Sequence, residues 1–209
     1  MKKIWTLLLI VLFPLLIARA YEPLPSQKLC NEKTTLVKMQ SRHNWSEYAN
    51  WSNQLIRATL DDAPSEAAIF NRLLTAQDAH GDWFKSFYGD DARNSIQNLL
   101  RTHSEHAHQV FAALGRDDKE AYQHAVTAWY ENADQLATAL HSLNPNWEAD
   151  TMRKMLNTLL ELLEKQASAH HAQNWDKEIN LSDECAAHLQ DFADQLAAGV
   201  INQFAEGFK

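Results

Sequence analysis

Helix-breaking residues are scarce over most of this chain, and they fall at regular intervals. Glycine occurs five times in 209 residues, and beyond Pro25 proline occurs only at Pro64 and Pro145. Ala, Leu, Gln, Glu and Asp dominate instead, a mixture that favours helix. The pattern argues against a sheet-rich fold and predicts an all-α protein.

Breaks divide the chain beyond residue 32 into segments whose apolar residues keep helical spacing. They lie at Pro64, Gly89, Gly115 and Pro145, with a further break near Trp175. These breaks predict about six long helices, over residues 33–60, 64–87, 91–114, 118–143, 148–173 and 182–204. Short joins between long helices force antiparallel neighbours, so we expect an up-and-down helical bundle over residues 33–205.

The two halves of this bundle, residues 33–115 and 117–205, share a pattern. Trp51 and Trp129 each begin a segment that leads to a proline break, and the last helix of each half carries a histidine, His103 or His188. Two duplicated three-helix units related by a pseudo-twofold axis would explain this pattern. The alternative is chance similarity between helical sequences.

Residues 1–20 have the features of a secretory signal peptide. A basic start precedes the apolar run 4–17 and the small-x-small sequence Ala18-Arg19-Ala20. The alternative is a membrane anchor, but a spanning helix needs about 20 apolar residues. We therefore expect an exported protein, periplasmic or secreted, with no stable membrane anchor after cleavage. Residues 21–32 would form an extended N-terminal arm.

The net charge of the chain limits the kinds of molecule that it is suited to bind. The formal net charge is −8, and cleavage would also remove the cations Lys2, Lys3 and Arg19. An acidic domain is poorly suited to bind nucleic acid or an anionic membrane. A small ligand or a protein partner remains.

The chain has two cysteines, Cys30 and Cys185, both within the part expected to be exported. Disulfides persist in such compartments, so we predict that the two residues pair. The alternative is two free thiols.

Histidine is frequent, with ten in the chain. His103 and His106 are three residues apart on one predicted helix and can face the same side. With His188 and Asp78 they form a candidate site for a divalent transition metal, Zn²⁺ or Cu²⁺. The alternative is that His103 and His188 are structural core residues and that the others, including His170-His171, lie on the surface.

Aromatic residues crowd the end of the second predicted helix. Trp83, Phe87 and Tyr88, with Trp129 from the second half, could line an apolar ligand pocket. The alternative is that these rings simply pack the end of the bundle.

No nucleophile elbow, glycine-rich phosphate loop or HExxH motif occurs, so we do not expect an enzyme. The composition and motifs favour a protein that binds a metal ion or small ligand in the bundle core. The alternative is a structural or partner-binding helical module, with its tryptophan-rich ends as the contact surface.

The segment 129–147, WYENADQLATALHSLNPNW, and the C-terminal AAGVINQF resemble a family of small uncharacterised bacterial helical-bundle proteins. Its members share W-Y-x-N-A-D, N-P-N-W and a C-terminal G-[IV]-I-x-Q-F, and the resemblance covers about residues 45–209. It implies a helical bundle and no particular activity. His103 and His188 match histidines of that family, whereas Tyr48 and Leu159 stand near positions where it carries further histidines. If the family binds a metal through all of them, the resemblance implies that this chain has lost half of the site.

Overall fold

The computed structural model describes residues 32–208, which are all-α and contain no strand. The predicted signal peptide and nearly all of the predicted arm fall on residues 1–31, outside the described residues. Five helices follow one another, α1 (Glu32–Leu60), α2 (Glu66–Gly115), α3 (Lys119–Leu143), α4 (Ala149–His171) and α5 (Trp175–Gln203), and the short 3₁₀ turn η1 (Ala205–Phe208) ends them. None of these helices is long and apolar enough to cross a membrane.

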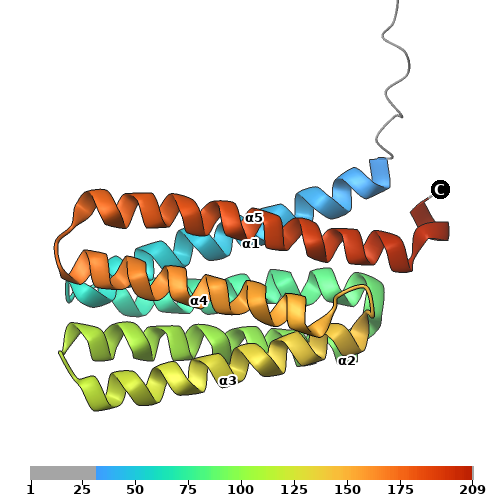
Figure 1. Ribbon diagram of the computed structural model, residues 1–209. Coiled ribbons are helices and arrows are strands. Elements are labelled where there is room, and N and C mark those ends of the chain that lie inside the picture. The colour runs from blue at the N-terminus through green and yellow to red at the C-terminus, as the bar shows by residue number, and fades with distance from the viewer. Residues whose placement is uncertain (1–31, 209) are drawn as a thin grey trace, which may run out of the picture. The chain divides into compact units, whose positions relative to one another are not determined.

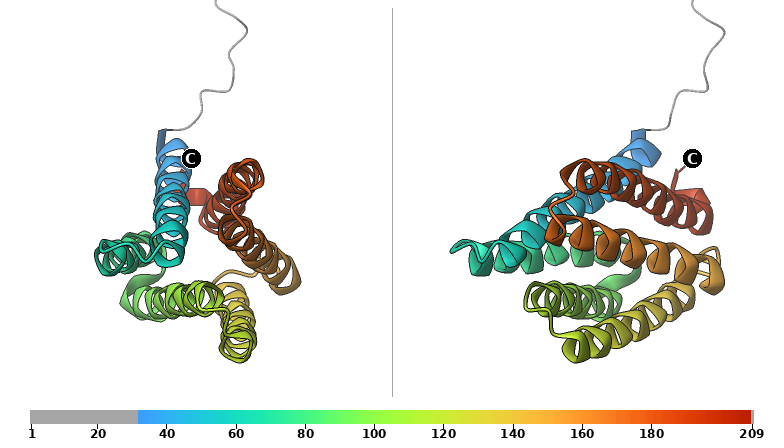
Figure 2. Two further views of the ribbon diagram at one scale, coloured as in Figure 1. Left: turned by 90° about the vertical axis from the view of Figure 1, so that its left-hand side faces the viewer. Right: turned by 60° about the vertical axis from the view of Figure 1, so that its left-hand side comes forward.

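The helices pack side by side as a bundle (Figure 1). Seen along its length, the bundle is a ring in which α1, α2, α3, α4 and α5 follow in chain order (Figure 2). The ring closes where α5 returns to α1, and there the Ser41 hydroxyl donates to the Ala193 carbonyl at 2.9 Å. Arg57 near the end of α1 binds Glu178 near the start of α5 at 2.8 Å, so these two helices run antiparallel.

Helix α2 folds back on itself at Gly89, where φ is 82° and ψ is −173°. Only glycine adopts this conformation without strain. Arg93 binds Asp82 at 2.7 Å across the bend, and His108 binds Glu66 at 2.7 Å far from it. The two arms of α2 therefore run antiparallel, and the predicted break at Gly89 separates two helical arms.

The start of α5 differs from the prediction. The sequence suggested a helix from Ser182, whereas α5 begins two turns earlier at Trp175, where the Asn174 side chain accepts a hydrogen bond from Lys177 N at 3.3 Å. The first turns of α5 show no apolar stripe because their buried inward residue is Glu178. A charged residue in a core position hid the beginning of this helix.

Apolar side chains fill the interior along all five helices. The Trp147 ring, fully buried, lies against α5 and donates from Nε1 to the Leu196 carbonyl at 3.2 Å. It fits only because residue 199 is glycine, since a Cβ there would lie 2.0 Å from Trp147 Nε1. The α3–α4 join is thereby fixed against the C-terminal part of α5.

The two ends of the bundle differ in chemistry. One end, which we call the aromatic end, has a continuous set of ring contacts among Trp83, Phe84, Phe87, Tyr88, Trp147 and Phe204. At the other lies the charged end, where the joins α1–α2, α2–α3 and α4–α5 meet and which contains Arg57, Asp61, Asp117, His170, His171 and Glu178. In Figure 1 the bend of α2 and the α3–α4 join lie at one end of the bundle, and the joins α1–α2, α2–α3 and α4–α5 lie at the other.

Candidate functional site

His103, the first residue of the predicted metal site, is buried in the second arm of α2. Its Nδ1 lies 2.8 Å from the Asn132 amide oxygen, while the Asn132 amide nitrogen donates to the Leu99 carbonyl at 3.2 Å. Because an amide oxygen only accepts, Nδ1 carries the proton and Nε2 keeps its lone pair. Nε2 is buried without a hydrogen-bond partner among the described residues. Burial lowers the pKa of His103 to about 4, so the ring is neutral at physiological pH.

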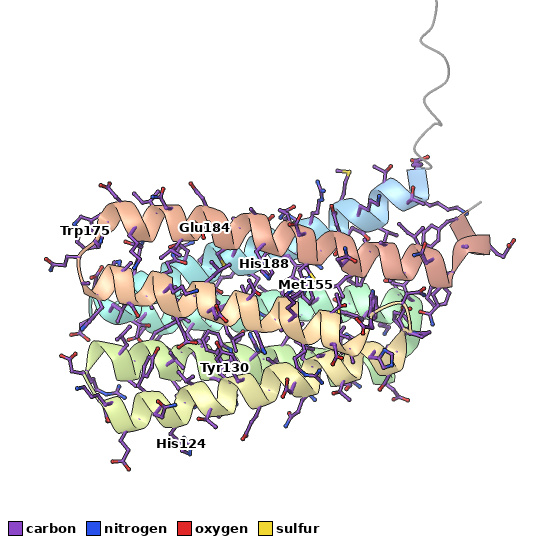
Figure 3. All side chains as sticks on the ribbon, viewed as in Figure 1. His124, Tyr130, Met155, Trp175, Glu184 and His188 are labelled. Atoms are coloured by element: carbon purple, nitrogen blue, oxygen red, sulfur yellow. The ribbon has the colours of Figure 1, made fainter. Side chains whose placement is uncertain are left out.

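The other three predicted metal residues have separate partners. His106 Nδ1 lies 3.3 Å from the Gln109 side-chain oxygen, and Asp78 accepts from Gln97 and Arg101. His188 Nε2 lies 2.7 Å from the Met155 carbonyl, and Figure 3 shows the two residues side by side on α5 and α4. Within residues 32–208 no group of three or more His, Cys, Asp or Glu side chains could hold a metal ion.

The predicted aromatic pocket is divided between two places. Trp83 and Phe87 are 5.3 Å apart by ring centroids, and Tyr88 lies 6.4 Å from Phe87, all in the aromatic end. Trp129 lies elsewhere, with its centroid 5.4 Å from that of His103 and 6.1 Å from that of Phe111. Three of the four predicted residues therefore pack ring on ring, as the alternative reading expected, and the fourth does not join them.

A groove between α1 and α5, with α4 at its base, is a better candidate for a binding site. It has a volume of about 450 Å³. Its lining consists of small, amide, hydroxyl and thiol side chains, Ser46, Ala49, Asn50, Asn53, Gln166, Ser182, Cys185, Ala186, Ala187 and Gln190. We call this the amide groove.

Three side chains join the helices across the amide groove. Gln166 Nε2 donates to Asn53 Oδ1 at 2.8 Å, and Asn53 Nδ2 donates to Ser182 Oγ at 3.0 Å. Gln166 is 1% exposed, and its amide group is held by Asn53 on the wall of the groove. An amide fixed in this way on the wall of a groove can offer its oxygen to a ligand N–H or O–H group.

Among the described residues, none of the side chains that line the amide groove is charged. Burial raises the pKa of the Cys185 thiol to about 12, and burial also raises the pKa of the adjacent Tyr48. Both groups stay neutral at physiological pH. The amide groove therefore offers hydrogen bonds without a net charge, which favours an uncharged polar ligand over an ion.

Cys185 also bears on the predicted disulfide, although Cys30 lies outside the described residues. Gln190 and Ser182, on either side of Cys185, bind Ser46 and Asn53, so the thiol lies beside the turn of α1 near Asn50. That turn is roughly 18 residues beyond the start of α1, or about 27 Å at 1.5 Å per residue.

The reach of the chain is much shorter than this distance. The two residue steps from Cys30 to Glu32, where α1 begins, span at most about 7 Å. A disulfide needs Cα atoms within about 7 Å of each other. The bridge stays a prediction, and it would require several turns of α1 to open.

One signal for the amide groove was overlooked in the amino-acid sequence. Gln166 continues the apolar stripe of α4 that includes Leu159 and Leu163, and a polar residue in such a position usually has a buried partner. His170 continues the same stripe. We expected it on the surface, but it is 5% exposed because Asp61 and Glu178 provide its partners.

Comparison of the chain with protein-family models, with curated proteins and with solved structures finds no match. The fold and the groove therefore define only a class, an all-α helical-bundle protein with a neutral polar groove. The family resemblance noted from the sequence stays a prediction.

Proposed function

We propose that this chain is an exported helical-bundle protein that binds a small, uncharged polar molecule in the amide groove. The observation that carries the proposal is the buried Gln166 amide, which lines the groove and is held there by Asn53. Asn50 at the rim is exposed and supplies a further amide. A side-chain amide both donates and accepts hydrogen bonds, and so does a peptide group. A ligand with a peptide-like group therefore fits the amides of Gln166 and Asn50 best.

A metal ion fits the described residues less well than a neutral ligand. Metal sites combine at least three converging donors, usually charged or imidazole groups. The amide groove contains no carboxylate or imidazole, and the predicted metal residues each have a partner of their own. We therefore retain the ligand-binding part of the sequence prediction and give less weight to the metal. We propose binding, not catalysis.

The probe for this proposal is N-acetylalanine amide, compared with N-acetylaspartate amide and N-acetyllysine amide. We expect the neutral probe to shift the side-chain amide resonances of Asn53 and Gln166 in a ¹H–¹⁵N spectrum. The charged probes should act much more weakly.

A matched pair of variants completes this test. Gln166→Leu removes the groove amide, whereas Gln135→Leu removes an exposed amide on α3. We expect Gln166→Leu to weaken the neutral probe at least tenfold and Gln135→Leu to leave it unchanged. Equal binding by both variants, or no binding by wild type, would refute the proposal.

Export is part of the proposal and rests on residues 1–20 alone. Cleavage between Ala20 and Tyr21 is the expected processing. N-terminal sequencing of the protein recovered from its native compartment tests it, and an intact Met1 would contradict it.

We also infer that residues 33–115 and 117–205 are duplicated three-helix units. The last helix of each unit packs on the first helix of the other, as in His103 with Asn132 and Ser182 with Asn53. Superposition of the two halves of an experimental structure tests this inference. Failure of the three helices to superpose in order would contradict it.

A further inference from the structure

Trp175 is more exposed to solvent than the other tryptophans of the described residues. Trp175 is 50% exposed at the start of α5, and Ile179 one turn later is 52% exposed. Figure 3 shows Trp175 at the tip of the bundle, at the start of α5. Residues four apart share one helix face, so the two side chains form a single apolar patch. We call it the Trp175 patch.

The base of the Trp175 patch is held in place. The Trp175 ring meets the ring of the buried His170 edge to face, with centroids 5.3 Å apart. His170 Nδ1 lies 3.0 Å from Glu178 and its Nε2 lies 3.0 Å from Asp61. An exposed aromatic ring on a fixed base loses little conformational entropy on binding, which is typical of interface anchors.

The rim of the Trp175 patch is acidic. Asp176 is next to Trp175, Asp183 is one turn beyond Ile179, and Asp61 lies beside His170. Asp176 and Asp183 form no ion pair with a described residue. The nearby Arg57 is bound to Glu178, and Lys177 follows Asp176 in the sequence. An apolar centre within an acidic rim is complementary to a large apolar side chain flanked by cations.

From this complementarity we propose that the Trp175 patch docks a short cationic segment of a partner protein, with Lys or Arg around an apolar side chain. A second copy of this chain would bring one acidic rim against another. An anionic lipid surface would be repelled by the same carboxylates. The proposal is separate from the amide groove and does not depend on it.

The chain offers a matched control for this surface. Leu36 and Met39 on α1 form another exposed apolar pair, 50% and 62% exposed, three residues apart on one helix. The test compares Trp175→Ser with Ile179→Ser against Leu36→Ser with Met39→Ser. All four positions are exposed, so both double variants should keep the wild-type circular dichroism spectrum.

The probe is a fluorescently labelled helical peptide of Leu and Lys, with a counterpart in which Glu replaces every Lys. We expect the Lys peptide to bind wild type, to shift the Trp175 indole resonance and to bind more weakly as salt rises. The Trp175/Ile179 variant should lose at least tenfold in affinity, and the Leu36/Met39 variant should match wild type.

Each other outcome overturns the proposal. Equal losses in both double variants, or equal binding of the Glu peptide, would show that charge and place do not matter. A wild-type dimer in sedimentation velocity that Trp175→Ser abolishes would assign the patch to a second copy. Binding to anionic vesicles but not to the Lys peptide would assign it to a lipid surface.

Discussion

The aromatic end and the charged end both consist of helix ends and joins, yet they are stabilised in different ways. The aromatic end is closed by rings in contact, with Tyr88 also donating to Gln203 at 2.7 Å. At the charged end, Glu178 is buried between Arg57 and His170, and within residues 32–208 no comparable set of ring contacts covers the joins. The contrast shows that two ends of one bundle can be fixed by packing or by ion pairs.

The two ends also differ in their backbone. The bend at the aromatic end uses Gly89, which tolerates its positive φ. Each join at the charged end instead has a non-glycine residue at positive φ, Asp62, Asp117 or Gln173, at 50° or 55°. Each of these residues ends a helix in the left-handed conformation, with hydrogen bonds of 2.9 to 3.0 Å from Ala63 N, Asp118 N and Asn174 N to carbonyls five residues earlier.

The largest expected effect tests packing at the aromatic side. Gly199→Ala places a Cβ 2.0 Å from Trp147 Nε1, so the tryptophan must leave its site. Displacing a buried Trp should lower the free energy of unfolding by about 3–5 kcal/mol. Urea unfolding measures this, and Gly207→Ala, whose Cβ meets nothing within 4 Å, is the control. If both variants unfold like wild type, Trp147 does not hold this end.

Low pH should lower the free energy of unfolding through His103, which belongs to neither the aromatic end nor the charged end. Burial lowers the pKa of His103 to about 4, from an ordinary value of 6.5. The unfolded chain therefore takes up the proton first, and stability falls as pH drops from 6.5 towards 4. At about 1.4 kcal/mol per pKa unit, the loss is roughly 3 kcal/mol.

Thermal unfolding between pH 7 and pH 4 measures this loss. His103→Gln keeps a donor for Asn132 and cannot titrate, so its stability should fall less steeply with pH. Burial also lowers the pKa of His80, to about 3, and the remaining slope should be shared with that residue. An unchanged slope in His103→Gln would contradict the burial of a neutral ring.

A somewhat smaller effect tests the ion pairs at the charged end. Glu178→Ala removes the buried carboxylate that binds Arg57 and His170. Breaking a buried pair can cost 3–5 kcal/mol, but Arg57 is partly exposed, so we expect about 2 kcal/mol. The control Glu161→Ala breaks the exposed pair with Lys165 and should cost a few tenths of a kcal/mol. Similar losses in the two variants would mean that burial of Glu178 adds nothing.

The smallest effects come from exchanging glycine between the two ends. Gln173→Gly should stabilise the protein by about 0.5–1 kcal/mol because it relieves the positive φ of 55°. Gly89→Ala should destabilise it by about 1–2 kcal/mol, although its Cβ would meet no atom within 4 Å. Chemical denaturation should show stability changes of opposite sign for the two variants, which would support the backbone difference between the two ends. Changes of the same sign would contradict that difference.

Helix boundaries could be predicted because their signals are local. Pro64, Gly89 and Pro145 mark breaks that the structure retains. The beginning of α5 was missed because its inward residue, Glu178, looks like a surface residue until Arg57 and His170 are known to face it. Of the four predicted metal residues, only His103 and His106 lie on one helix with a spacing that lets them face the same side. Spacing within a helix does not determine which helices contact each other.

The amino-acid sequence by itself determined the helical content, the breaks and the antiparallel order, because each depends on residues within a few positions of one another. Only the tertiary structure decided which polar side chains are buried. Gln166 and His170 became core residues through Asn53 and Asp61, more than 100 positions away in the chain. Their burial costs free energy unless those partners are present, and folding alone brings the partners together. The amide groove and the fixed base of the Trp175 patch both depend on such distant pairs.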